Sequence, residues 1–395
     1  MVSLHSGSAA DATPLSTGAT RTPAAPPDQR LMSLDALRGF DMACLLGGQQ
    51  IVAALAKGAP EGSWLHALRQ QFTHVEWAGF RFYDFIFPLF LFMIGMAVPY
   101  AVDRRRARGE TSSRILRHAL IRFAGMVFFG WWATGNLLSW DVAQMRLSYS
   151  VLMMLGFGYL IAVLLVLFTS LRTQIVATGA ILVGYWVLQM GVPVPGHVAG
   201  EFKAGAILSD WLYDHSVGLL GKPWSSQYGR GFLLSLWPHG ATAMLGVFAT
   251  QILRGAAAPG KKLRWLVLLG AACLAAGWWW SLHFPIVKSR WTSTYVLWAG
   301  GWSFLLLALF YWIIDVRGLR RWAGLFTAIG SNSLLAYLIA GVFVAPFRSL
   351  AERLFGGLLA HLGDYWSGVG MAVATFGFAW LLLVYLHRRK IFLRL

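Results

Sequence analysis

The chain has 395 residues, of which 57% are hydrophobic and only 12% are charged, and its formal net charge is +17. Soluble domains usually carry about 25% charged residues, so this composition excludes an ordinary soluble domain. Apolar runs of roughly 20 residues, the length of a helix that crosses a bilayer, recur along the sequence. We therefore expect an all-α polytopic membrane protein, because a membrane β-barrel would show short alternating segments instead.

Residues 1–30 are rich in Ala, Ser, Thr and Pro and contain no apolar core. We expect a disordered cytoplasmic tail there, neither a cleaved signal nor a span. Residues 31–395 form the predicted transmembrane domain, with about ten membrane helices. The apolar runs place these helices at 36–56, 79–101, 116–136, 147–169, 174–191, 232–253, 264–282, 292–314, 324–343 and 368–387.

The basic residues concentrate in alternate connections, of which 102–117 holds six: Arg104, Arg105, Arg106, Arg108, Arg114 and Arg117. The positive-inside rule then predicts that both termini face the cytosol. The long loop 192–231 and the segment around His74 would lie at the outer face. Since the positive charge is spread over short connections, it indicates membrane topology and no nucleic-acid partner.

Polar residues beside the second predicted span are the first functional candidates, because ionisable groups in a membrane are costly. His74 has an unperturbed pKa near 6.5 and can act as a base. Asp84 lies about one and a half turns inside the span and needs a partner. Arg81 could pair with it along the helix. Alternatively, Asp84 orients His74, which requires the chain before Gly79 to fold back.

Polar residues also interrupt later apolar runs. Arg38, in "SLDALRGFDM", could pair with Asp35 one turn earlier or contact a phosphate from the cytosol. Asn332, in "GSNSLLAY", could bond across helices or donate to a developing oxyanion.

Three further polar or aromatic candidates lie near the predicted outer ends of spans. Lys288 and Trp291 belong to "FPIVKSRWTS", which precedes the eighth span, and His239 belongs to "WPHG" in the sixth. His239 is more plausible as a hydrogen bonder beside a proline kink than as a catalytic group. The two cysteines form no disulfide framework or metal motif, and no nucleotide-binding glycine pattern is present, so we expect no metal.

Five stretches together resemble the heparan-alpha-glucosaminide N-acetyltransferase family and its bacterial relatives. In chain order they are "RLMSLDALRGFDM", "HVEWAGFRFYDFIFPLFLFMIG", "FPIVKSRWTSTYVL", "YWIIDVRG" and "IGSNSLLAY". The resemblance implies a transmembrane acetyltransferase of the bacterial inner membrane, with the His74 loop facing the periplasm. It would take acetyl from cytosolic acetyl-CoA and pass it to an amino sugar or a sugar hydroxyl. It further implies membrane lipid as surroundings and pairing of two copies as a homodimer.

The resemblance also assigns roles. The family's active-site histidine matches His74, and the catalytic group would include Asp84 and Asn332. Acceptor binding is expected from Glu76, Trp77, Lys288, Trp291 and His239. Positive charge for the CoA phosphates would come from Arg38, Arg104, Arg105, Arg117 and Lys261.

The chain departs from its relatives at "QYGRGFLLSLWPHG" and "RLSYSVLMMLGFGY", which leaves the acceptor open. His74 could act as a general base or carry the acetyl group itself. Two other functions stay open: a transporter or flippase that uses the same buried polar groups, and a scaffold that binds a partner through loop 192–231.

Overall fold

The computed structural model describes residues 31–134, 141, 148–215, 225–226 and 232–393. The tail expected at 1–30 lies outside these residues, as do parts of the loop expected at 192–231. Contacts group the chain from Met32 onward into one unit.

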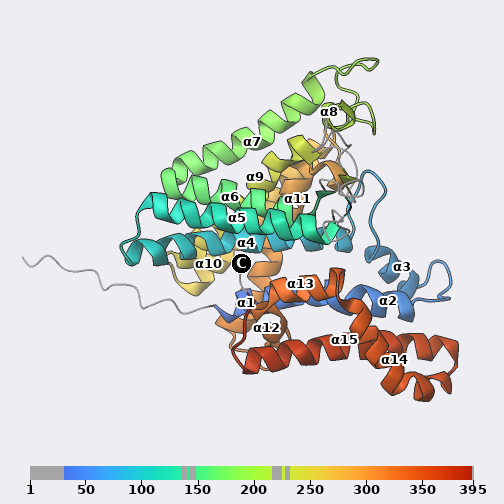
Figure 1. The fold of residues 1–395 in the computed structure, drawn as a ribbon. Helices are drawn as coiled ribbons and strands as arrows, with labels where there is room; N and C mark the ends of the chain where they lie inside the picture. The colour runs from blue at the N-terminus through green and yellow to red at the C-terminus, as the bar shows by residue number, and fades with distance from the viewer. Residues whose placement is uncertain (1–30, 135–140, 142–147, 216–224, 227–231, 394–395) are drawn as a thin grey trace, which may run out of the picture. The chain divides into compact units, whose positions relative to one another are not determined.

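The described chain is almost entirely helical (Figure 1). Its first half contains α1 (Met32–Ala43), the π-helical turn η1 (Cys44–Gly48), α2 (Gln49–Leu55), α3 (Trp64–Gln71), α4 (Phe82–Ala107), α5 (Ser112–Thr134), α6 (Val151–Phe168), α7 (Leu171–Gly191) and α8 (Leu208–His215). Its second half contains α9 (Phe232–Arg254), α10 (Pro259–Ser281), the 3₁₀ turn η4 (Lys288–Arg290), α11 (Ser293–Phe310), the π-helical turn η5 (Tyr311–Val316), α12 (Ala323–Ser331), α13 (Ser333–Gly341), α14 (Val344–Ala360) and α15 (Gly363–Arg388). The two-residue strands β1 (Ser148–Tyr149) and β2 (Ser225–Ser226) pair in parallel.

Six helices in the described residues are long and apolar enough to cross a membrane: α4, α6, α7, α10, α11 with η5, and α15. Helices α12 and α13 make a seventh if they count as one span, although an 82° bend separates them. The helical fold class is confirmed, and the apolar helices support an integral membrane protein. The predicted count of ten spans and the orientation are not confirmed.

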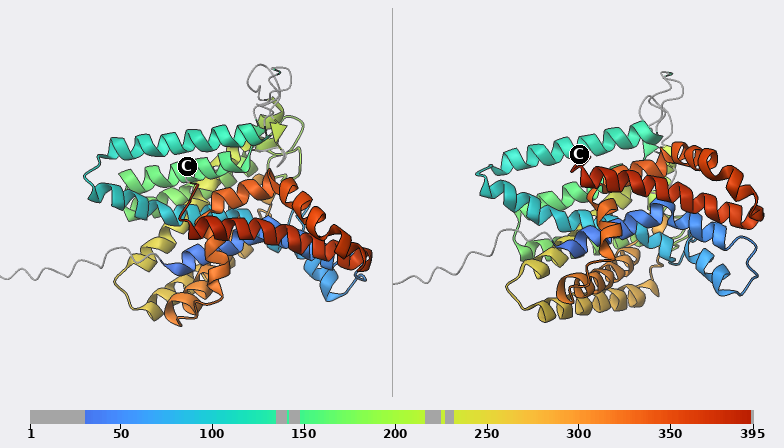
Figure 2. Two further views of the ribbon diagram at one scale, coloured as in Figure 1. Left: turned by 60° about the horizontal axis from the view of Figure 1, so that its bottom comes forward. Right: turned by 90° about the horizontal axis from the view of Figure 1, so that it is seen from below.

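Helix α14 was not predicted, because 344–367 was expected to be a connection. It packs against α15 along one side of the unit (Figure 2). Its sequence, VAPFRSLAERLFGGLLA, mixes charged and apolar residues. A search for membrane-length apolar runs therefore passes over it.

Helix α4 is the central element and contacts α9, α6, α11, α1 and α5. Glycines allow its close approach to α9. A Cβ atom on Gly95 would overlap the backbone carbonyl of Ala243, and one on Gly246 would overlap that of Phe92. Small residues at such crossings let membrane helices pack backbone to backbone.

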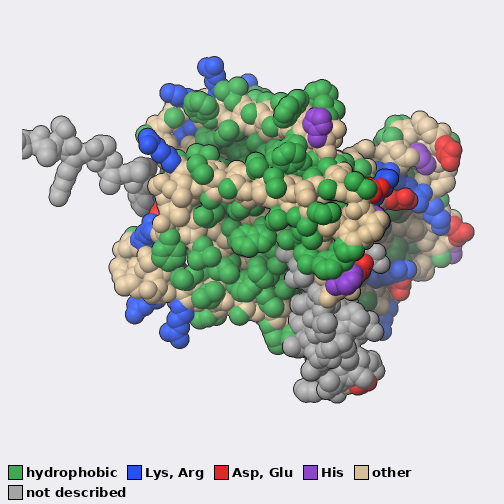
Figure 3. Space-filling view, turned by 90° about the horizontal axis from the view of Figure 1, so that it is seen from above, with side chains coloured by type: hydrophobic (Ala, Val, Ile, Leu, Met, Phe, Trp, Pro, Cys, Tyr) green, Lys and Arg blue, Asp and Glu red, His purple; other side chains and the backbone are tan. Residues whose placement is uncertain are grey.

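The two ends of α4 differ in charge. The helix starts with Asp84 in its first turn and finishes with Arg104, Arg105 and Arg106 in its last. Arg254, at the end of α9, pairs with Asp103 of α4, so both helices finish at this basic end. In Figure 3, Lys and Arg side chains lie along the left edge and also at the right, where most of the visible Asp, Glu and His side chains are.

The glycine packing predicts the effect of a single methyl group. Gly95→Ala should lower the free energy of unfolding by about 1–3 kcal/mol, because α4 and α9 must separate to admit it. Gly179→Ala on α7 is the matched control, since nothing lies within 4 Å of a Cβ at that position. Thermal unfolding in detergent measures both variants, and equal melting temperatures would contradict the packing argument.

Candidate functional site

The side chain of Asp84 collects four donors at the start of α4. Its Oδ1 accepts a hydrogen bond from His74 Nδ1 at 2.7 Å and forms an ion pair with Lys288 Nζ at 3.2 Å. Its Oδ2 accepts the backbone N–H groups of Val75 at 3.3 Å and Arg81 at 3.2 Å. An ionised carboxylate offers about four acceptor sites, and all four are occupied here. This saturation allows Asp84 to be buried, with 1% of its side chain exposed.

The backbone of Asp84 is also held from another helix. Pro88, four residues later, has no N–H, so the Asp84 carbonyl loses its usual intrahelical partner. The hydroxyl of Tyr295, from the first turn of α11, donates to that carbonyl at 2.7 Å. The proline therefore leaves an acceptor free, and Tyr295 uses it to join the beginnings of α4 and α11.

The chain before α4 folds back, as a contact between His74 and Asp84 requires. Gly79 has a φ of 131°, which favours glycine, and its N–H donates to the carbonyl of Ile286 at 2.9 Å. The Arg81 guanidinium donates to the carbonyl of His74 at 3.0 Å. The alternative side-chain pair between Arg81 and Asp84 is thus replaced by a fold in which Asp84 meets His74 directly.

The Asp84 contact decides which nitrogen of His74 can act as a base. Because an ionised carboxylate only accepts, Nδ1 carries the hydrogen and Nε2 keeps its lone pair. Nε2 has no hydrogen-bond partner within the described part of the chain, and 55% of the side chain is exposed. The ring of Tyr83 lies beside it, with centroids 5.1 Å apart. His74 is therefore oriented, accessible and able to accept a proton.

Lys288 reaches Asp84 from η4, a turn that is fixed by a buried ion pair. Two nitrogens of Arg290 bond the two oxygens of Asp210 in α8 at 2.6 and 2.9 Å. These side chains are 7% and 0% exposed. The guanidinium also lies 5.0 Å from the centroid of the Trp77 ring, and the Arg290 carbonyl accepts the Tyr185 hydroxyl.

Sequence reasoning missed the pair of Arg290 and Asp210 because 80 residues separate its members. The only available signal was an Arg beside Lys288 and an Asp in the long loop, and neither indicates the other.

Burial lowers the pKa of Lys288, and the negative charge of Asp84 acts in the opposite direction. The Nζ atom also lies 3.1 Å from His74 Nδ1. Since Nδ1 donates to Asp84, the carboxylate is the acceptor for Lys288 as well. The three side chains thus form one cluster with a single central acceptor, which we call the Asp84 cluster.

Trp291 and His239 form a buried wall close to this cluster. Trp291 has a left-handed backbone with φ 50°, and its ring stacks on that of His239 at 4.0 Å. Trp291 also contacts Tyr295, whose hydroxyl holds Asp84. His239 directly follows Pro238 in α9 and donates from Nδ1 to the carbonyl of Ser235, one turn earlier.

Asn332 is not brought to the Asp84 cluster. It lies between α12 and α13, where its Nδ2 donates to the carbonyl of Ile391 at 2.8 Å and its Oδ1 accepts the N–H of Leu393 at 2.9 Å. Its amide is occupied by the C-terminal segment and has no contact with His74. These contacts join the break between α12 and α13 to the C-terminal segment, and the catalytic role of Asn332 stays a prediction.

The other candidates are dispersed. Glu76 is exposed, and Arg38 pairs with Asp35 at 3.7 Å. Arg105 pairs with Glu110 at 2.8 Å, and Arg117 and Lys261 are exposed. Arg104 and Arg105 follow Asp84 on α4 by 20 and 21 residues, which is roughly 30 Å along a helix. The residues expected to hold phosphate on α4 are therefore far from His74.

No family model matches the chain. Among curated proteins, it is 27% identical to human heparan-alpha-glucosaminide N-acetyltransferase (Homo sapiens), over 81% of this chain and 55% of that protein. It is 26% identical to the mouse protein of the same name (Mus musculus), over 68% of this chain and 48% of that protein. The chain thus spans about half the length of the curated relatives that it matches.

The apolar helices and the buried polar cluster define a helical integral membrane protein with a candidate active site at one end. The two matches extend over most of the chain and confirm the resemblance. The chain is a distant relative of the heparan-alpha-glucosaminide N-acetyltransferase family.

The cluster predicts how the pKa of Lys288 responds to a neighbouring substitution. Asp84→Asn removes the charge that raises this pKa and leaves only the burial that lowers it. The pKa should therefore fall further, so that Lys288 loses its proton at a lower pH than in the unsubstituted protein. NMR titration of ¹³C-methylated lysines measures the change.

Lys203 provides the matched control for this titration. It is a surface lysine whose pKa is raised by Glu201, and Asp84→Asn should leave it unaltered. A Lys288 pKa that stays constant or rises in Asp84→Asn would contradict the arrangement.

Proposed function

We propose that this chain is a transmembrane acetyltransferase that moves acetyl from cytosolic acetyl-CoA to an amino sugar or sugar hydroxyl across the membrane. The proposal places the protein in a bacterial inner membrane, with His74 facing the periplasm. The Asp84 cluster is the observation that carries it, because it presents an oriented imidazole with a free Nε2. The family resemblance supports the type of reaction.

In the first route His74 is a general base. Its Nε2 accepts a proton from the acceptor amine or hydroxyl as that group attacks the thioester carbonyl. The C–S bond breaks, the acetyl group moves to the acceptor, and CoA leaves as a thiolate that takes up the proton. Asp84 stabilises the imidazolium through Nδ1–H in the same way as the carboxylate of a catalytic triad.

In the second route Nε2 attacks the thioester carbon itself. An acetyl-imidazole forms and CoA leaves, after which the acceptor attacks the acetyl group and restores the imidazole. Both routes need the same tautomer of His74. They differ in kinetics, since only the second predicts a ping-pong pattern.

Lys288 has a separate role in this proposal. Attack on the thioester places negative charge on the carbonyl oxygen, which a positioned donor stabilises. The Lys288 ammonium lies beside His74 and is itself held by Asp84, so it can supply that donor. The acceptor would be contacted by Trp77, whose ring packs against the Arg290 guanidinium, and by the exposed Glu76.

The donor would arrive from the opposite end. Arg38, Arg104, Arg105, Arg117 and Lys261 supply positive charge there for the CoA phosphates. The buried pair of Trp291 and His239 would form part of the wall against which the pantetheine arm and the acceptor meet.

Acetyl transfer gives the direct test. The purified protein, incubated with acetyl-labelled CoA and glucosamine, should release CoA and form N-acetylglucosamine. His74→Ala should lower the rate by about 10²–10⁴-fold, the usual contribution of a positioned proton-transfer group.

His66→Ala is the matched control, because the His66 ring in α3 bonds Gln70 of the same helix and lies outside the Asp84 cluster. It should keep the full rate. Equal rates for His74→Ala and His66→Ala would refute the assigned role. Solute uptake into vesicles without CoA release would refute the enzymatic proposal as a whole.

A further inference from the structure

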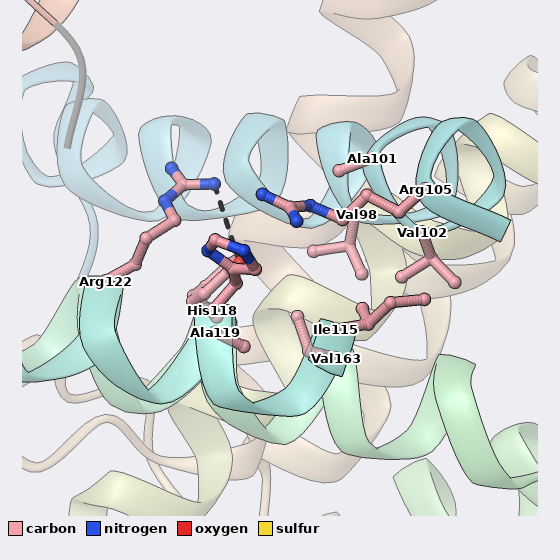
Figure 4. A pocket seen from close by; sticks show the side chains of 10 residues that line it. Val98, Ala101, Val102, Arg105, Ile115, His118, Ala119, Arg122 and Val163 are labelled. Atoms are coloured by element: carbon pink, nitrogen blue, oxygen red, sulfur yellow. Dashed lines mark hydrogen bonds between the residues drawn. The ribbon is translucent and has the colours of Figure 1, made fainter. Parts of the chain in front are cut away.

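A small cavity of about 40 Å³ lies between α4, α5 and α6, away from the Asp84 cluster. Figure 4 shows Arg105 of α4 opposite His118 and Arg122 of α5 across this space. Its floor is apolar and includes Val98 and Ile115. Three nitrogen-rich side chains from two helices thus converge on one opening.

The positive charge around this cavity exceeds the negative charge. None of the described residues that line it is acidic. Arg105 pairs with Glu110 in the turn after α4, but Arg122 has no carboxylate partner in the described chain. Its guanidinium lies 4.8 Å from the centroid of the Tyr159 ring and donates weakly to the Tyr159 hydroxyl at 3.5 Å. One full charge therefore faces the cavity without a counter-charge.

Arg122 is exposed in an apolar stretch of α5, so a ligand can reach its guanidinium. It follows Ser112, the first residue of α5, by ten residues, which is about 15 Å along the helix. Its neighbour Ile121 is 57% exposed and Phe128 is 55% exposed, so this stretch of α5 presents apolar side chains outward.

We propose that the cavity of Arg105, His118 and Arg122 binds a phosphate group. A guanidinium matches two phosphate oxygens with two parallel hydrogen bonds, which is why arginine is suited to this anion. The Tyr159 hydroxyl can donate a further bond from α6. The opening lies toward the basic end of α4, so the phosphate can belong to an anionic lipid headgroup or to CoA. The CoA alternative rests on the acetyl transfer proposed above, whereas the lipid alternative does not.

Binding to purified protein in a neutral detergent tests the proposal and separates the two sources. The probes are dioctanoyl phosphatidic acid, with dioctanoylglycerol as its phosphate-free control, and CoA, with dephospho-CoA as the control that lacks the 3′-phosphate. Dissociation constants are measured for the unsubstituted protein, Arg122→Gln and Arg348→Gln. Arg348 is an arginine of α14 that pairs with Glu352 and lies outside the cavity.

At least one phosphate probe should bind more tightly than its control. Arg122→Gln should weaken that binding by about tenfold or more, as expected for the loss of hydrogen bonds to a charged group, and Arg348→Gln should not. Preference for phosphatidic acid identifies a lipid site, and preference for CoA over dephospho-CoA identifies a nucleotide phosphate. If Arg122→Gln does not fold, Arg105→Gln takes its place. Equal binding in the cavity variant and Arg348→Gln, or no binding of either probe, would overturn the proposal.

Discussion

The candidate site depends on one buried carboxylate and its four donors. Isolated burial of the Asp84 charge would be strongly unfavourable, and only a complete set of partners makes it tolerable. Two of these partners are backbone N–H groups of the segment before α4, and two are the side chains of His74 and Lys288. The same interactions that stabilise the charge therefore fold the loop, select the His74 tautomer and bring Lys288 into place.

Further contacts make the arrangement rigid. The missing N–H of Pro88 lets Tyr295 join α4 to α11, and the ion pair of Arg290 and Asp210 fastens η4 to α8. A site whose side chains are held by packed and hydrogen-bonded neighbours keeps its geometry during reaction. These supports come from four elements, namely α4, α8, η4 and α11. The site is consequently a property of the whole bundle at this end, with the segment 72–84 as its centre.

Sequence reasoning recovered the helical class. It offered the contact between His74 and Asp84 as one of two alternatives, beside a pair of Arg81 and Asp84, because charged residues next to an apolar run are conspicuous and close in the chain. It selected Lys288 as a residue that contacts the acetyl acceptor. It could not place Lys288 beside His74, since 214 residues separate the two in the chain. Asn332 was placed in the catalytic group by the family resemblance, and its hydrogen-bond partners in the structure are backbone groups 59 and 61 residues away. Helix α14 was not predicted, because its charged residues interrupt the apolar pattern.

The Asp84 cluster lies at one end of α4, and Arg104, Arg105 and Arg106 lie at the other. This arrangement suits the proposed acetyl donor, which would enter from the arginine end and extend toward His74. The most direct measurement of this account is a cryo-EM map of the protein with acetyl-CoA bound. We predict density for the thioester in contact with His74 Nε2, with the Lys288 ammonium beside the carbonyl oxygen. A thioester located away from the Asp84 cluster, with His74 Nε2 facing another partner, would contradict the account.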